Sequence, residues 1–185
     1  GGALGVAGAA LQGLLRNPLA EPGLIGVSGT AALGAVIAFY SGLSVTFPFA
    51  LPAGGMIGAL ISVVLLYMLA GRDPSVLTLI LAGVAISALA GALTTLALNL
   101  SPNPYAAFEI FFWLMGSLAD RSLNHVALAV PFITVGIVLL MTTGPSLDAL
   151  TLGEDVAQSL GVRLSSLQAR VIIGTALAVG ASVSV

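Results

Sequence analysis

The stretch QGLLRNPLAEPGLIGVS, residues 12–28, decides the fold, because it places polar, charged and proline residues between two long apolar runs. An apolar helix is expected to end at Arg16, since Pro18 and Pro22 cannot continue it. A second helix is expected to restart near Leu24. The residues that form the turn between them are Arg16, Asn17, Pro18, Glu21 and Pro22. This pattern predicts a sharp turn at the face of a membrane.

The composition of the chain supports a membrane location. Of the 185 residues, 58% are hydrophobic and only 6% are charged, whereas about a quarter of the residues of an ordinary soluble domain are charged. The apolar runs are each close to the ~20 residues that a helix needs to cross ~30 Å of hydrocarbon, and a membrane barrel would show short alternating segments instead. A soluble helical protein would need polar outer faces that so few charged residues cannot supply. We therefore predict an all-α, polytopic transmembrane helical bundle.

The residue types that are absent or rare exclude several kinds of site. The chain has no cysteine and one histidine, so neither a disulfide framework nor a metal centre is expected. It has no lysine, which excludes the phosphate-binding loop Gly-x-x-x-x-Gly-Lys of an ATPase. The net charge of −2 is dispersed, without a basic patch for nucleic acid. We expect no catalytic residue and no cofactor, and any ATP hydrolysis must come from another polypeptide.

Six membrane spans are predicted from the apolar runs and from the polar or proline-rich connectors between them. They are residues 1–15, 23–43, 53–70, 76–100, 126–143 and 169–185. Arginines fall on alternate connectors, at positions 16, 72, 163 and 170, and only Arg121 falls on the other side. The positive-inside rule then places the first turn and the long segment 145–167 in the cytoplasm. Because the chain begins and ends within apolar runs, we expect it to be a fragment of a longer protein.

An aromatic segment, residues 105–117, is apolar but too short to span a bilayer. Its aromatic residues are Tyr105, Phe108, Phe111, Phe112 and Trp113. We expect an interfacial helix on the outer face, and a buried re-entrant segment is the alternative. Nearby charged residues that could contact an external protein, or only headgroups and solvent, are Glu109, Asp120 and Arg121. The single histidine, His125, is expected to be an interfacial anchor rather than a haem ligand.

Small residues recur at every fourth position in the first four spans. These stripes are Gly1, Gly5, Ala9, Gly13; Gly26, Thr30, Gly34, Ala38, Gly42; Gly54, Gly58, Ser62; and Gly83, Ser87, Gly91. Such stripes let helix backbones approach closely in lipid. We interpret them as packing surfaces, and a stripe that faces an open space is the alternative.

The spans bear on two classes of membrane protein. An ion-coupled secondary transporter is disfavoured, because the spans contain almost no ionisable side chain and the prolines that break the chain are expected to lie in connectors. A membrane scaffold without a transport role is the second class, and the sequence does not exclude it.

The long cytoplasmic connector predicts a short surface helix. Thr151 or Gly153 can begin it, Glu154 and Asp155 would lie in its first turn, where the helix dipole favours acids, and Gly161 would end it. The residues expected on its apolar face are Leu152, Val156 and Leu160. That face suits either docking of a cytoplasmic partner or contact with the bilayer.

Three blocks of this sequence resemble the FecCD family, the membrane-spanning permeases of bacterial ABC importers for iron-siderophores, haem and vitamin B12. The blocks are QGLLRNPLAEPGLIGVS at 12–28, LILAGVAISALAGA at 79–92 with WLMGSL at 113–118, and LTLGEDVAQSLGV at 150–162. They occur in the order and spacing of that family and extend over essentially the whole chain. The resemblance implies a type II ABC importer permease fold, to which this chain contributes about six of an expected ten spans.

The same resemblance implies function and partners. The protein would move an iron-siderophore chelate, or haem or cobalamin, across the bacterial inner membrane by ATP-driven alternating access. Its partners would be cytoplasmic ATP-binding subunits, a second permease subunit, identical or not, an external substrate-binding protein, and membrane lipid. The residues that match the family's ATPase-coupling loop are Leu152, Gly153, Glu154, Asp155, Ala157, Leu160 and Gly161.

The family's transport pathway is lined chiefly by the helix that matches residues 76–100, with a gate near residues 73–78. The pathway and gate candidates in this sequence are Ser75, Thr78, Ser87, Thr94, Thr95 and Asn99. Ser75 and Thr78 are offset from the pair of small hydroxyl residues of the family's B12 importer, so the resemblance does not identify the gate residues. It does not identify the chelate either.

Overall fold

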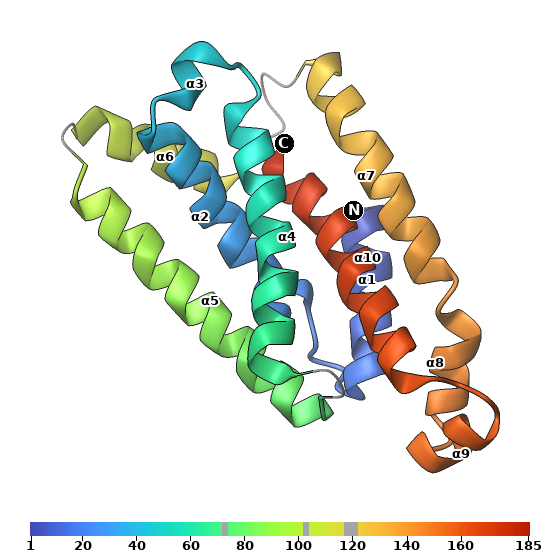
Figure 1. Ribbon diagram of the computed structural model, residues 1–185. Coiled ribbons are helices and arrows are strands. Elements are labelled where there is room, and N and C mark those ends of the chain that lie inside the picture. The colour runs from blue at the N-terminus through green and yellow to red at the C-terminus, as the bar shows by residue number, and fades with distance from the viewer. Residues whose placement is uncertain (72–73, 102–103, 117–121) are drawn as a thin grey trace.

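Every element of the described residues is a helix, which confirms the predicted all-α fold (Figure 1). The computed structural model describes residues 1–71, 74–101, 104–116 and 122–185, without the side chains of residues 45, 104–107, 109 and 113. The helices are α1 (Gly2–Leu15), the 3-10 helix η1 (Pro22–Ile25), α2 (Val27–Tyr40), α3 (Leu43–Thr46), α4 (Ala50–Ala70), α5 (Val76–Asn99), α6 (Pro104–Met115), α7 (Leu123–Met141), α8 (Gly144–Leu150), α9 (Glu154–Ser159) and α10 (Leu164–Ser184).

Four of the helices in the described part of the chain, α4, α5, α7 and α10, are long and apolar enough to cross a membrane. The apolar helices α1 and α2 have 14 residues each. At 1.5 Å per residue they extend about 21 Å, which is less than the ~30 Å of a hydrocarbon core. Six spans were predicted, and two of them are therefore shorter helices. The span predicted at 23–43 is too long, because Gly26 and Gly42 adopt left-handed φ angles of 84° and 74° at the two ends of α2.

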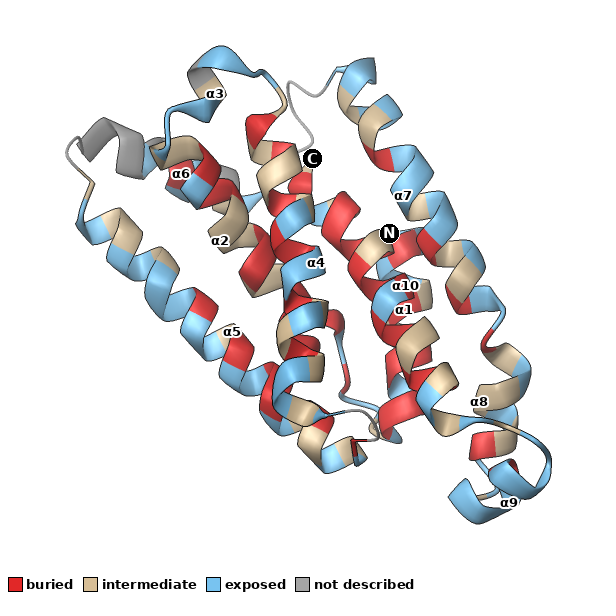
Figure 2. Cartoon of the chain, in the orientation of Figure 1, coloured by how far each residue is buried: buried red, intermediate tan, exposed pale blue. Residues whose placement is uncertain are grey.

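Helix α10 is the central helix of the bundle and packs against α1, α2, α4 and α7 (Figure 2). Within its apolar stretch, 61% is buried inside the protein, compared with 17–28% in the other three long helices. Its fully buried side chains include Leu167, Val171, Ile172 and Val179. Burial of apolar groups alone does not hold helices together in lipid, so close packing around α10 has to supply much of the stability.

Glycines bring α2 and α4 into backbone contact. A Cβ added to Gly34 would collide with the carbonyl oxygen of Gly54, and a Cβ added to Gly58 would collide with the carbonyl oxygen of Thr30. Both obstacles are backbone atoms of a packed helix, so neither can move aside cheaply. The predicted packing role is confirmed for Gly34, Gly54 and Gly58, but it is wrong for Gly42, which has no atom within 4 Å of an added Cβ.

The stripes in α1 and α5 pack only in part. Gly83 lies against the carbonyl oxygen of Leu24, whereas Gly1, Gly5 and Gly91 have no neighbouring atom within 4 Å of an added Cβ. The packing prediction is therefore wrong for these three glycines within the described chain, because all three are exposed and no described element packs against them.

One proline lies inside a long helix, contrary to the sequence-based expectation that prolines lie only in connectors. Pro131 is in the interior of α7, and the helix continues through it from Leu123 to Met141. In a spanning helix, neighbouring groups and small local adjustments can satisfy the carbonyl that a proline leaves free. Pro52 is also helical, but it lies in the first turn of α4, where backbone N–H groups have no helical partner.

The turn and the long connector also differ in detail from the prediction. The second helix does not restart near Leu24, because Pro22–Ile25 form η1 and α2 begins only after Gly26. The connector predicted at 145–167 contains two short helices, α8 and α9, rather than one. Helix α10 begins at Leu164 and not at residue 169. The helix can include Arg170 in its second turn, because the long side chain of an arginine can extend toward the helix end.

Candidate functional site

The candidate site is the end of the bundle where α1 ends and where α5 and α10 begin, at the bottom of Figure 1. The turn that follows α1 and the short helices α8 and α9 gather at this end. The described arginines, Arg16, Arg163 and Arg170, all belong to it. Arg72 and Arg121, which also entered the sidedness prediction, lie outside the described residues.

Arg16 joins the turn to α8. It ends α1 in the left-handed conformation, at φ 48° and ψ 39°, and its N–H bonds to the carbonyl oxygen of Gln12. Its guanidinium Nη2 donates a 2.8 Å hydrogen bond to the carbonyl oxygen of Leu150, the last residue of α8. Holding the backbone of a non-glycine residue in this conformation costs of order 1 kcal/mol or more. Arg16 therefore makes its contact with α8 from a strained backbone.

The rest of the turn is held by its own polar groups. Gln12 Nε2 donates to the carbonyl oxygen of Pro18 at 2.9 Å, and the N–H of Leu19 donates to Asn17 Oδ1 at 2.9 Å. Glu21 precedes η1 and Pro22 is its first residue. The structure thus confirms a compact turn at these five predicted residues, while their functional role stays a prediction.

Helix α9 begins and ends on glycines. Gly153, at φ 112°, precedes it, so Gly153 rather than Thr151 begins the helix. After the last turn, the N–H of Gly161 donates to Gln158 O at 2.9 Å and the N–H of Val162 donates to Ala157 O at 3.0 Å. These two bonds form a Schellman motif, for which the left-handed φ of 87° at Gly161 is required.

The two faces of α9 differ sharply in burial. Ala157 is fully buried and belongs to the main hydrophobic core. By contrast, Leu152, Val156 and Leu160 expose 64%, 44% and 64% of their surface. Glu154 and Asp155 occupy the first turn, where the helix dipole favours acids, and both are exposed. Helix α9 is therefore anchored on one side and presents uncovered apolar and acidic side chains on the other.

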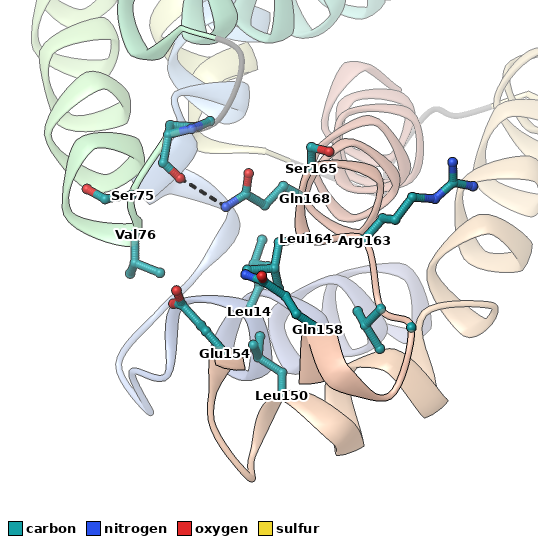
Figure 3. Close-up of a pocket in the computed structure, with 13 residues that line it drawn as sticks. Leu14, Ser75, Val76, Leu150, Glu154, Gln158, Arg163, Leu164, Ser165 and Gln168 are labelled. Atoms are coloured by element: carbon teal, nitrogen blue, oxygen red, sulfur yellow. Dashed lines mark hydrogen bonds between the residues drawn. The ribbon is translucent and has the colours of Figure 1, made fainter. Parts of the chain in front are cut away.

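A hollow of about 700 Å³ lies between α9 and the first turns of α5 and α10 (Figure 3). Figure 3 shows Glu154 and Gln158 of α9 on one side and Ser75, Val76, Leu164 and Gln168 on the others. Gln168 is only 8% exposed, and its Nε2 donates a 3.0 Å hydrogen bond to the carbonyl oxygen of Pro74. The predicted docking loop and the start of the predicted pathway helix therefore border the same space.

The structure brings two of the pathway candidates together. Ser75 is the N-cap of α5, its Oγ accepts a 3.2 Å hydrogen bond from the N–H of Thr78, and it lies 2.8 Å from Thr78 Oγ1. A serine N-cap satisfies one of the free N–H groups of the first turn. The paired hydroxyls thus define where α5 begins. Asp73, two residues before Ser75, lies outside the described residues.

The other four pathway candidates do not join this pair. Ser87 Oγ donates to Gly23 O at 2.9 Å, which attaches α5 to η1. Thr95 Oγ1 donates to Gly91 O and Asn99 Nδ2 donates to Thr95 O, each at 2.9 Å within α5. Thr94 Oγ1 is buried without a hydrogen-bond partner among the described residues. The six candidates are thus spread along the 24-residue length of α5.

Sequence reasoning missed Gln168 and the Arg16–Leu150 contact. The two hydrogen bonds join residues 94 and 134 positions apart. A buried glutamine at the start of an apolar helix is a weak signal, because the sequence does not show which carbonyl it meets.

The opposite end of the bundle contains the outer-face candidates. His125 Nδ1 lies 2.9 Å from Ser122 Oγ, and the His125 ring packs edge-on against Phe49 with ring centres 5.5 Å apart. No three His, Cys, Asp or Glu side chains of the described residues gather as a metal site. Phe108, Phe111 and Phe112 of α6 are exposed. Asp120, Arg121 and the side chain of Glu109 lie outside the described residues, so their predicted contacts stay predictions.

Comparison with known proteins now identifies the family. The FecCD transport family matches residues 1–185. The chain belongs to the FecCD transport family. The resemblance found in the three sequence blocks is therefore confirmed.

Individual members show how much of a FecCD protein this chain represents. It is 40% identical over 185 residues to the vitamin B12 import system permease protein BtuC of Vibrio cholerae and 34% identical over 195 residues to the hemin transport system permease protein HmuU of Yersinia pestis. All of this chain is covered, but only 55% and 56% of those proteins. A solved inward-facing ABC transporter, assigned to the metal-chelate type, matches with a TM-score of 0.84 and 30% identity, over 100% of this chain and 59% of that one. The chain thus spans about half the length of the curated relatives it matches.

Proposed function

We propose that this FecCD chain is the membrane-spanning part of a permease subunit of an ABC importer for a bulky metal chelate, in the bacterial inner membrane. The observation that carries the proposal is the family match over every residue of the chain. Iron-siderophore complexes, haem and cobalamin are the candidate cargoes. The named relatives favour cobalamin and haem, and iron-siderophores belong to the same size class of chelate.

We propose that α9 docks on a cytoplasmic ATP-binding subunit. The uncovered side chains of Val156 and Leu160 would fill an apolar pocket of that subunit, and Glu154 and Asp155 would meet basic groups at its rim. Buried apolar contacts at the centre with charges at the edge are the usual arrangement of an interface. The buried Ala157 and the Schellman motif support this role, because they hold α9 in a fixed conformation before the partner arrives.

The hollow beside α9 suggests how docking acts on the pathway. Closure of the two ATP-binding subunits would push α9 and the first turns of α10, and Gln168 would carry that shift to Pro74 and the start of α5. Rigid helices that rotate about such contacts produce alternating access. Ser75 and Thr78 would then move with the cytoplasmic gate, and the chain itself performs no chemical step.

A second permease subunit would complete the pathway along the uncovered side of α5. Leu77, Leu81 and Leu89 of that helix are each more than half exposed. Thr95 and Asn99 are exposed as well, and their side-chain hydrogen bonds go to their own helix. A wall of apolar and weakly polar groups suits a large chelate that passes without being held tightly.

The proposal is tested by co-purification of the full-length protein with its cytoplasmic ATP-binding subunits in detergent. We compare the wild type with the double variant V156D/L160D in α9 and with L123D, a substitution at the opposite end of the bundle. Leu123 is 85% exposed, so both changes place charge at exposed apolar positions. We expect the ATP-binding subunit to stay with the wild type and L123D and to be lost from V156D/L160D.

Monodisperse elution of each variant in size-exclusion chromatography controls for folding. A well-folded wild type that retains no ATP-binding subunit would contradict the importer proposal. Retention by V156D/L160D would leave the importer proposal standing but would remove α9 as its docking element.

A further inference from the structure

A second hollow, of about 450 Å³, lies between α8 and the first turns of α10. The polar side chains that line it are Ser146, Arg163, Ser166 and Arg170. No acidic side chain of the described residues lines it. Figure 3 shows the Arg163 guanidinium directed away from Glu154 and Gln158 of α9. This hollow is therefore a cationic pocket without a carboxylate of its own.

The two arginines border the hollow from the start of α10. Arg163 is the N-cap of α10, and Ser166 and Arg170 are four residues apart, so their side chains project on the same side of the helix. Arg170 lies about 9 Å along α10 from its first residue, at 1.5 Å per residue. Its Nε donates a long 3.4 Å hydrogen bond to Ser166 O, which leaves most of the guanidinium donors unused by described residues. Positive charge at this depth in a spanning helix needs a partner.

The same face becomes apolar farther along α10. Ile173 is 37% exposed and Leu177 is partly buried, and both continue the line from Ser166 through Arg170. The order from the helix start is thus cationic, then apolar. A free inorganic anion would use only the first part, whereas a phospholipid with a negatively charged headgroup matches both parts.

We propose that this pocket binds the phosphodiester headgroup of an anionic phospholipid. Arg163 and Arg170 would pair with the phosphate oxygens, the hydroxyls of Ser146 and Ser166 would donate to them, and an acyl chain would follow Ile173 and Leu177. Basic pockets between spanning helices at the cytoplasmic side are suited to such headgroups. The lipid would bridge α8 and α10, the two helices that flank α9, and would hold that end of the bundle together.

The test is native mass spectrometry of the delipidated full-length protein in detergent, titrated with phosphatidylglycerol or with phosphatidylcholine of the same acyl chains. Inorganic phosphate is added in a separate series as a competitor. Two variants are compared with the wild type: R163Q/R170Q, which removes both charges, and R163K/R170K, which keeps them. Lysine binds phosphate as a point charge, so the second variant is the matched control.

We expect the wild type to prefer phosphatidylglycerol and R163Q/R170Q to bind it about 25-fold more weakly, since each of the two basic residues near an anionic headgroup contributes a factor of about five. R163K/R170K should retain most of the preference, and millimolar phosphate should not displace the lipid.

Three results would overturn the proposal. Equal binding of the two lipids by the wild type would mean that the pocket does not select an anionic headgroup. Full competition by phosphate would indicate a free-anion site, and no bound lipid on the wild type would indicate that another protein segment covers the arginines. These comparisons use the wild type alone, so they decide the question even where R163Q/R170Q does not fold.

Discussion

Gln168 Nε2 donates a 3.0 Å hydrogen bond to the carbonyl oxygen of Pro74 and thereby joins the second turn of α10 to the residue that precedes the N-cap of α5. Gln168 is almost completely buried. Pro74 is followed directly by Ser75, whose hydroxyl caps α5. The start of the central helix and the start of the predicted pathway helix are therefore held in one position by a single buried side chain.

Replacement of Gln168 by leucine should destabilise the protein by about 1–3 kcal/mol, because the buried carbonyl of Pro74 would lose its donor. Thermal unfolding in detergent measures the effect. S165A, an exposed change in the same turn of α10, is the matched control and should leave the midpoint unchanged. Equal midpoints for Q168L and wild type would show that the hydrogen bond contributes no net stability.

The crossing of α2 and α4 should tolerate no side chain larger than hydrogen at Gly34 or Gly58. We expect G34A and G58A each to reduce the yield of folded protein strongly, since the added methyl group would collide with a backbone carbonyl. G91A is the control, because Gly91 has free space around it and alanine favours a helix by about 0.5–1 kcal/mol. Fluorescence-detected size-exclusion chromatography measures the folded fraction. Normal yield of G34A would mean that the two helices separate more easily than this packing implies.

Arg16 combines a strained backbone with a hydrogen bond, and two substitutions separate the two contributions. R16A removes the bond to Leu150 O and keeps the strain, whereas R16G removes both. We expect R16A to be the less stable variant by about 1 kcal/mol, the usual cost of a left-handed residue with a Cβ. Thermal unfolding of both variants tests this order. The reverse order would show that the flexibility of glycine in the unfolded chain outweighs the relief of strain.

Local sequence signals predicted an all-α fold and its long apolar helices, but η1, α3 and α8 were not predicted, and the starts predicted for α2 and α10 were wrong. Long apolar runs indicated the spanning helices. Thr151 or Gly153 was predicted to begin α9 and Gly161 to end it, and the structure shows Gly153 and Gly161 with positive φ angles, which most other residues avoid. Pro131 lies inside α7, within the span predicted at 126–143, since a proline does not end a helix whose neighbours can satisfy the freed carbonyl.

The candidate site was harder to predict from the sequence, because the contacts that define it join residues that are far apart in the chain. Leu150 and Arg16 are 134 residues apart, and nothing local to either residue indicates the other. The hydroxyl residues of α5 were correctly placed on one helix, but periodicity did not separate Ser87, which bonds to η1, from Thr95 and Asn99, which face outward.

The glycines that bound α9 provide the last prediction. G153A and G161A place a Cβ at φ angles of 112° and 87°, where L side chains are strained whatever the space around them. We expect both variants to loosen α9 and to weaken retention of the ATP-binding subunit, while the rest of the bundle stays folded. Hydrogen–deuterium exchange of residues 154–159 reports on the helix, and co-purification reports on docking.

G144A is the matched control for this pair. Gly144 begins α8, has no atom within 4 Å of an added Cβ, and has no positive φ angle. It should therefore leave both the exchange of α9 and the docking unchanged. Because the strain acts only on the ends of α9, a loss of protection confined to residues 154–159 together with weaker docking would link the rigidity of this helix to its proposed role. Faster exchange with undiminished docking would show that the partner itself orders α9 on binding.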